Sequence, residues 1–286
     1  MSINFYSKFF PLIKKGVASV PFQLRPLSTR TDLFNVENKS EEYAIFRLNK
    51  PPVNSLNLEY LNLLNNQLDE FERNPKLKGI ILTSDVKSTF SAGVDILEMY
   101  KCEPKRLEAV WRAVQDFWIK LYGSKKIYIA ALNGHVLALG CAIAMSCDYR
   151  IMVDNDKTKI GITAVLLGIN APSWVKNTMI NTIGFRETEK SLKFAKIYNP
   201  HQALKLGLID EIVSSDKLLS RSEEVMKTWC KIPTLAREMT KESMRSETLG
   251  KLVNNREVDV QEFITSTMDP HLQDNLGKYL ASLKKK

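Results

Sequence analysis

Two glycine-containing segments have the residue types and spacing best suited to chemistry. Phe90–Ile96 follows an apolar run that ends at Thr83, and Asn133–Cys141 follows a second apolar run. The first amides of a helix lack backbone acceptors and carry partial positive charge. Two such segments side by side would direct two N–H donors at one oxygen, forming an oxyanion hole. Ordinary turns, which also use glycine after strands, explain the spacing as well.

Motifs for several other reactions are absent from the sequence. It contains no GxGxxG, GxxxxGK[ST], HExxH or GxSxG pattern, so nucleotide-phosphate binding, zinc hydrolysis and a serine nucleophile lack support. The four cysteines have no CxxC spacing, and the three histidines are scattered. We therefore expect buried, unpaired thiols, no structural metal and no cofactor.

Short apolar runs alternate with amphipathic stretches up to about residue 213. The patterns predict strands at Tyr43–Leu48, Gly79–Thr83, Ile127–Leu132 and Tyr149–Val153. Helical stripes are predicted between them, at residues 61–71 and 107–121, and the sequence is almost wholly helical after Lys217. Such alternation is typical of an α/β core.

Positive charge is concentrated at the two ends of this 286-residue chain, whose net charge is +9. Residues 1–31 contain no acid and five bases: Lys8, Lys14, Lys15, Arg25 and Arg30. A basic, amphipathic, serine-containing start is typical of a mitochondrial presequence, although a basic tail is an alternative, and Lys8 and Pro11 argue against a secretory signal. The nearly balanced remainder argues against nucleic-acid binding, and no apolar run is long enough to span a membrane.

From Tyr43 onward the chain resembles the crotonase family, the enoyl-CoA hydratases and isomerases. Three early matches are Leu48–Leu56, Phe90–Ile96 and Asn133-Gly134. Later matches are Cys147–Arg150, Leu167–Ile169, Ala203–Asp210 and Asp259–Phe263. The Pro-Pro-Val-Asn-Ser-Leu segment points to the mitochondrial Δ3-Δ2 isomerase branch.

The resemblance implies a spiral of ββα units over residues 32–215 and a C-terminal helical region, 216–286, that forms homotrimers in the mitochondrial matrix. It implies an acyl-CoA or enoyl-CoA ligand, with coenzyme A as part of the substrate. The N–H groups of Val94 and Leu139 would polarise the thioester carbonyl. The implied substrate-binding residues are Ala92, Gly93, Val94, Asp95, Ile96, Leu139 and Thr163.

The sequence departs from the family at the positions that move protons. Ala164 occupies the position of the isomerase glutamate, and Thr163 replaces the preceding asparagine. Ala142 occupies the position of a second glutamate that hydratases use, and Leu139 replaces a glycine. Alanine cannot accept a proton, so general-base catalysis, which contributes about 10²–10⁴-fold, lacks its usual group.

Other side chains are weak substitutes for the missing base. Asp95 at a helix start is best interpreted as a cap, and Glu98 as a solvent-facing or paired carboxylate. His135 is best interpreted as a hydrogen-bonded spectator, and Asp154 and Asp156 as loop charges.

Three hypotheses follow for the function. The first is an enoyl-CoA isomerase of fatty-acid β-oxidation that moves 3-cis or 3-trans double bonds to 2-trans. The second is a catalytically silent acyl-CoA-binding or assembly partner. The third is a different reaction on a CoA thioester, because fold alone does not fix function.

Overall fold

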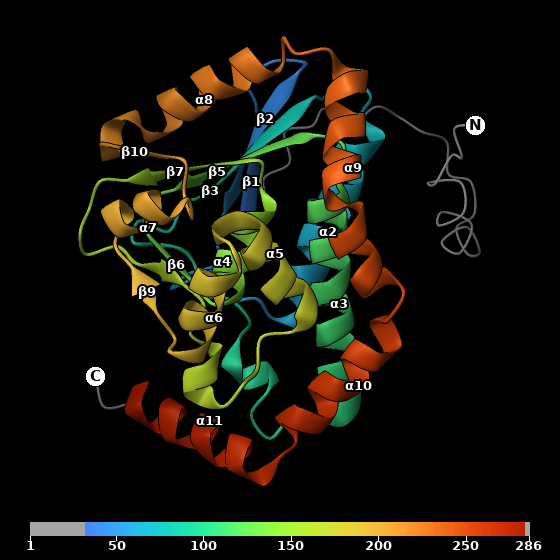
Figure 1. The fold of residues 1–286 in the computed structure, drawn as a ribbon, viewed down its shortest axis with the longest axis vertical. Helices are drawn as coiled ribbons and strands as arrows, with labels where there is room; N and C mark the ends of the chain where they lie inside the picture. Colours follow the sequence, from blue (N-terminus) through green and yellow to red (C-terminus); the bar gives the residue numbers. More distant parts are fainter. Residues whose placement is uncertain (1–31, 284–286) are drawn as a thin grey trace.

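The computed structural model describes residues 32–283, which form two β-sheets enclosed by helices (Figure 1). The predicted presequence lies outside the described residues. No helix among residues 32–283 has the length and apolar character needed to cross a membrane.

The larger sheet has six strands in the order β1-β2-β3-β5-β7-β10. Only the β1–β2 pair is antiparallel, and the other neighbours are parallel. The strands are β1 (Phe34–Asn38), β2 (Tyr43–Leu48), β3 (Gly79–Ser84), β5 (Ile127–Leu132), β7 (Tyr149–Val153) and β10 (Glu211–Val213). The four strands predicted from apolar runs are all present, and β1 and β10 join them at the edges.

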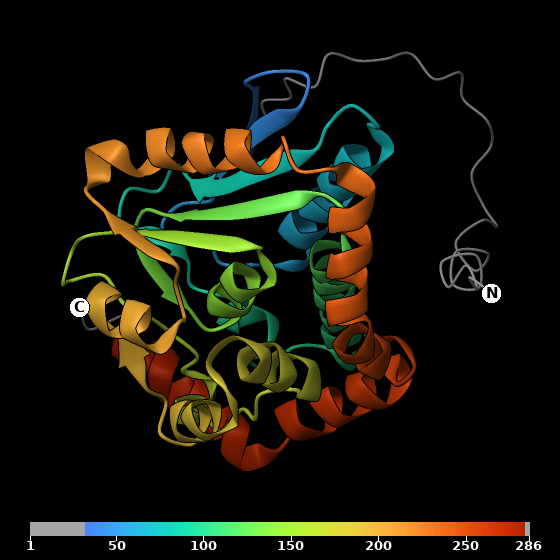
Figure 2. The same cartoon turned by 45° about the horizontal axis from the view of Figure 1, so that its top comes forward.

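Both faces of this sheet are buried, which explains why its strands are apolar throughout. Ile45, Ile81 and Ile129 point to one face, where α8 covers them. Their neighbours Phe46 and Leu82 point to the opposite face and join the main core. Figure 2 shows α8 lying across one side of the sheet, with most other helices on the opposite side.

A second, four-stranded sheet has the order β4-β6-β8-β9. Its strands are β4 (Thr89–Ser91), β6 (His135–Leu137), β8 (Ile160–Gly161) and β9 (Ile197–Tyr198). The sequence patterns did not predict this sheet and placed its first two strands in loops. Strands of two or three residues are too short to show a hydrophobic period.

The helices fall into an inner group and a C-terminal group. The inner α-helices are α2 (Leu58–Arg73), α3 (Pro104–Gly123), α4 (Leu139–Ser146), α5 (Ser173–Ile183), α6 (Phe185–Lys193) and α7 (Pro200–Leu206). The described residues also form the 3-10 turns η2 (Ile96–Glu98), η3 (Ala164–Leu167) and η4 (Ser215–Lys217). The C-terminal helices are α8 (Leu218–Trp229), α9 (Thr234–Val253), α10 (Arg256–Thr267) and α11 (Pro270–Leu283).

The C-terminal helices pack on the α/β core. Helices α9 and α10 contact α3, and α11 contacts η3 (Figure 1). A buried ion cluster fixes α9: Asp148, after α4, lies 2.7 Å from Lys241 Nζ and 2.9 Å from an Arg245 nitrogen. These cations hold the pKa of Asp148 below its usual value despite its burial. The cluster joins α9 to the sheet, because Asp148 also accepts a hydrogen bond from the Tyr128 amide.

Candidate active site

Parallel pairing of β4 with β6 brings the two glycine segments together. The chain leaves both strands at the same edge of the sheet, and α4 begins within the second segment, at Leu139. A Cβ atom added to Gly93 would lie 2.7 Å from the Leu139 amide nitrogen, and one added to Gly140 would lie 2.4 Å from the Ser91 carbonyl oxygen. Gly93 also has φ +87°, a conformation that favours glycine. Glycine therefore permits the contact between the turns.

The main-chain amides of Val94 and Leu139 have no acceptor among the described residues. Nearby amides are occupied: Ala92 donates to Val53, Asp95 to Leu56 and Ala138 to Gly161. Leu139 is the first residue of α4, where the helix dipole adds positive potential. The two groups predicted to polarise a carbonyl are thus both available and lie on adjoining turns.

These turns border a largely apolar cavity of about 620 Å³. Val94, Leu137, Ala138 and Leu139 form part of its wall. The other lining residues come from the first glycine turn, α3, the η3 region and the C-terminal helices: Ala92, Ile96, Met99, Trp111, Ile162, Thr163, Ala164, Leu166, Leu167, Ile169, Asn170, Ala171, Pro172, Val175, Phe263, Asn275, Lys278 and Tyr279. The cavity is thus shaped to surround an apolar group next to the two amides.

Burial distinguishes a closed end of the cavity from its mouth. Trp111, Phe263 and Met99 line the cavity and are only 5%, 7% and 5% exposed, and we call this solvent-excluded part of the wall the closed end. Leu166 is 71% exposed, and it lies with Lys278 and Tyr279 at the mouth. A ligand with an apolar tail and a charged head would therefore place its tail toward Trp111.

The part of the cavity wall formed by residues 32–283 contains no carboxylate. Ala164 and Thr163 line it, whereas Ala142 is fully buried in α4 and does not. None of the lining residues among the described ones is Asp, Glu, His or Cys. The cavity can thus bind and polarise a carbonyl group, but it offers no carboxylate or imidazole to take a proton.

The candidate substitute bases are engaged elsewhere. Asp95 caps η2 by accepting a hydrogen bond from Leu97, and it also accepts one from Ser55 Oγ. Glu98 is buried and forms a bidentate ion pair with Arg106, in which both N···O distances are 2.7 Å. Neither carboxylate lines the cavity, which agrees with their interpretation as structural groups.

His135, Asp154 and Asp156 do not line the cavity either. His135 Nδ1 accepts a hydrogen bond from the Lys159 amide. Asp154 faces His201 at 3.1 Å, and Asp156 is exposed. Within residues 32–283, no group of His, Cys, Asp or Glu residues could hold a metal ion.

The implied substrate-binding residues divide into two sets. Ala92, Val94, Ile96, Leu139 and Thr163 line the cavity, but Gly93 and Asp95 do not. Gly93 packs against the Leu139 amide, and Asp95 accepts a hydrogen bond from Ser55. Their assignment as substrate-binding residues stays a prediction.

Sequence reasoning missed the wall contributed by α3, α10 and α11. Trp111 belongs to the apolar stripe predicted at residues 107–121, and the structure buries it in the main core, where it also lines the cavity. Spacing alone does not reveal the second role. The family match at Asp259–Phe263 was the available signal for α10.

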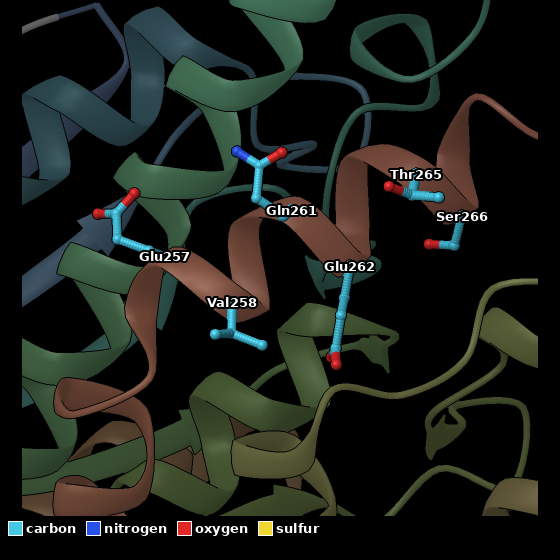
Figure 3. A pocket seen from close by; sticks show the side chains of 6 residues that line it. All are labelled: Glu257, Val258, Gln261, Glu262, Thr265 and Ser266. Carbon is cyan, nitrogen blue, oxygen red and sulfur yellow. The ribbon is translucent and has the colours of Figure 1, made fainter.

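A second hollow lies on the outer face of α10. Figure 3 shows its lining side chains, all from that one helix: Glu257, Val258, Gln261, Glu262, Thr265 and Ser266. The hollow is lined by this helix alone, although Glu257 at one end pairs with Arg112 of α3, and no residue is shared with the apolar cavity. We therefore place the candidate active site in the apolar cavity.

Known proteins with similar sequences include mitochondrial isomerases. Mouse enoyl-CoA delta isomerase 1, mitochondrial, is 42% identical over 243 residues, covering 85% of this chain and 84% of the mouse protein. Its human counterpart is 40% identical over 241 residues, covering 84% and 80%. These identities extend over most of both chains.

Solved structures and a family match agree with these similarities. Human mitochondrial delta3-delta2-enoyl-CoA isomerase superposes with a TM-score of 0.87 at 38% identity, covering 88% of this chain and 98% of that one. Enoyl-CoA hydratase from Bacillus halodurans, at 21% identity, shares the fold with a TM-score of 0.79, covering 86% and 99%. Residues 38–286 match the Enoyl-CoA hydratase/isomerase family. The chain therefore belongs to this family and has the crotonase fold that its sequence motifs predicted.

Proposed function

We propose that the chain is an enoyl-CoA delta-isomerase-like protein of mitochondrial fatty-acid β-oxidation that binds enoyl-CoA thioesters. The observation that carries this proposal is the pair of unused amides, Val94 and Leu139, beside one apolar cavity. Two N–H donors on one carbonyl oxygen stabilise the negative charge that develops when a thioester becomes an enolate. Coenzyme A enters as part of the substrate, and we propose no separate cofactor.

The rest of the cavity suits the other parts of such a ligand. The closed end is formed by Trp111, Phe263 and Met99, which offer an apolar surface to an acyl chain. Lys278 at the mouth offers a cation to the phosphates of coenzyme A. The 40–42% identity to mitochondrial enoyl-CoA delta isomerases supports both the ligand and the mitochondrial location.

Calorimetric titration tests the binding proposal. We expect a saturable heat with octanoyl-CoA and much weaker binding of free coenzyme A, which lacks the thioester carbonyl and the chain. Equal affinities for the two ligands would contradict a site built around the carbonyl.

Turnover is a separate question, because isomerisation removes a proton from C2 and returns one at C4. The similarity to isomerases favours a catalyst, whereas the absence of a carboxylate among the described lining residues favours a silent acyl-CoA-binding partner. Purified protein with 3-enoyl-CoA decides between them: formation of 2-trans product above a heat-inactivated control supports the catalyst. Binding without product supports the partner.

We further propose a homotrimer formed through the C-terminal helices. Large apolar side chains are exposed there: Leu235, Met239 and Met244 on α9, and Val258 on α10, are 56–76% exposed. Exposed apolar side chains gathered on one region favour contact with another protein surface. Light scattering at micromolar concentration should give three times the chain mass, and a monomer would contradict the proposal.

A further inference from the structure

The closed end of the cavity is held by two pairs of residues that face each other across α3 and α10. Trp111 and Gln115 are one helical turn apart on α3, and Asp259 and Phe263 are one turn apart on α10. The two helices are in contact along this stretch (Figure 1). Each residue of one pair thus has a partner on the other helix.

Stacking forms one of the two cross-helix contacts. The Trp111 and Phe263 rings lie 3.6 Å apart between centroids and 6° from parallel. Both rings line the cavity. Together they make a flat aromatic wall at its buried end.

Hydrogen bonding at one carboxylate oxygen forms the other contact. Asp259 Oδ2 accepts from Trp111 Nε1 at 2.7 Å and from Gln115 Nε2 at 2.8 Å. Gln115 is fully buried and is itself held by Arg256, whose carbonyl accepts from Gln115 Nε2 and whose Nε donates to its side-chain oxygen. Bonds to a charged acceptor are stronger than neutral ones. Neither Asp259 nor Gln115 lines the cavity, so they act on it only through Trp111.

We propose that Asp259 is a positioning residue that fixes the Trp111 indole against Phe263 and thereby sets the longest acyl chain that the cavity accepts. When the Trp111 and Phe263 rings are fixed, the cavity has a sharp limit of acyl-chain length. The affinity rises about fourfold for each methylene buried and stops rising when the acyl chain reaches the rings. A Trp111 without its acceptor can rotate away, and the limit becomes longer and less sharp. This inference rests on the proposed binding of acyl-CoA thioesters.

The test is a set of dissociation constants for saturated acyl-CoA thioesters from four to sixteen carbons. Asp259→Ala should raise the affinity for long chains relative to short ones by fivefold or more. Asp259→Asn keeps a carbonyl oxygen that can accept both hydrogen bonds, so it should retain the wild-type profile. A merely structural role for Asp259 would lower affinity for all chain lengths equally and leave the ratio unchanged.

Two further variants guard against misfolding and surface effects. Trp111→Phe keeps a ring on Phe263 but removes the N–H donor, and it should reproduce the longer limit of Asp259→Ala. Glu257→Gln, on the same helix, removes an exposed ion pair with Arg112 and should leave the profile unchanged. Unchanged profiles in both Asp259→Ala and Trp111→Phe would overturn this inference. Failure of wild-type protein to bind any of the thioesters would instead overturn the proposed function.

Discussion

The glycine turns and the η3 segment face the same cavity but have different chemical capacity. The turns retain two free amides, and these belong to the backbone, so the donors persist when Leu139 replaces glycine. The resemblance to isomerases implies that η3 supplies a side chain for proton transfer, and Ala164, which lines the cavity there, has no titratable group. Backbone donors therefore tolerate substitution as long as the turn keeps its shape, whereas a general base is lost with a single residue.

Restoring the side chain at η3 should have the largest effect. Ala164→Glu places a carboxylate on the cavity wall, and we expect 3-enoyl-CoA isomerisation to increase by about 10²–10⁴-fold, the usual contribution of a general base. The measurement is the rate of 2-trans-enoyl-CoA formation.

Two control variants separate the base from its position and shape. Ala164→Gln has a similar shape without a basic group, and Val165→Glu places a carboxylate on the neighbouring, exposed residue that does not line the cavity. Neither should gain activity. A rate for Ala164→Glu no higher than that of these controls would show that η3 alone does not explain the missing chemistry.

Disturbing the turns should have the next largest effect. Gly93→Ala places a Cβ atom 2.7 Å from the Leu139 nitrogen and strains a backbone with φ +87°, so it should displace both the Leu139 donor and the adjoining Val94 donor. Loss of two hydrogen bonds, each contributing ~1 kcal/mol, should weaken octanoyl-CoA binding about thirtyfold in calorimetry.

Gly184→Ala is the matched control for this change. Gly184 also has positive φ, +78°, but an added Cβ atom meets nothing within 4 Å. It should lower stability through backbone strain and leave the affinity unchanged. Equal loss of affinity in both variants would remove the special role of the turn contact.

A change of pH should alter the stability of the fold more than the affinity of the cavity for its ligand. Burial lowers the pKa of Lys241 to about 8 from 10.5 in the folded protein. Between these values the unfolded chain binds the extra proton, so the free energy of unfolding should rise with pH, by about 1–2 kcal/mol.

Chemical denaturation at pH 8 and pH 10 tests this prediction. The increase should be smaller in Lys241→Met, which leaves Asp148 paired with Arg245. Octanoyl-CoA affinity should vary little from pH 6 to pH 8, because no Asp, Glu or His is found among the described lining residues. The same slope in wild type and variant would contradict the assignment to Lys241.

Removing the Leu139 side chain from the second turn should have the smallest effect. Leu139→Gly restores the residue type of the family but keeps the same N–H donor, so we expect thioester affinity to change less than about fivefold. Only the contacts of one partly buried side chain are lost. A change as large as that of Gly93→Ala would show that the Leu139 side chain, and not only its amide, determines binding.

The sequence predicted the strands and turns that position the site better than it predicted the side chains that line the cavity. The buried strands β3 and β5 were predicted from their apolar runs, and the resemblance to the crotonase family implied the Val94 and Leu139 amides in the turns that follow. The short strands β4 and β6 were not, because they carry no periodicity, although their pairing is what joins the turns. Trp111 is a core residue that also lines the cavity, and the sequence did not reveal this second role, since an apolar helical position looks the same whether it faces protein or ligand.

The most direct test of the account is the infrared stretching frequency of the thioester carbonyl in bound octanoyl-CoA, identified by ¹³C labelling of that carbon. Two amide donors withdraw electron density from the C=O bond, so the frequency in the wild-type complex should fall below that of the free ligand, and Gly93→Ala should reverse most of that fall. A bound carbonyl with the frequency of the free ligand would contradict polarisation by Val94 and Leu139.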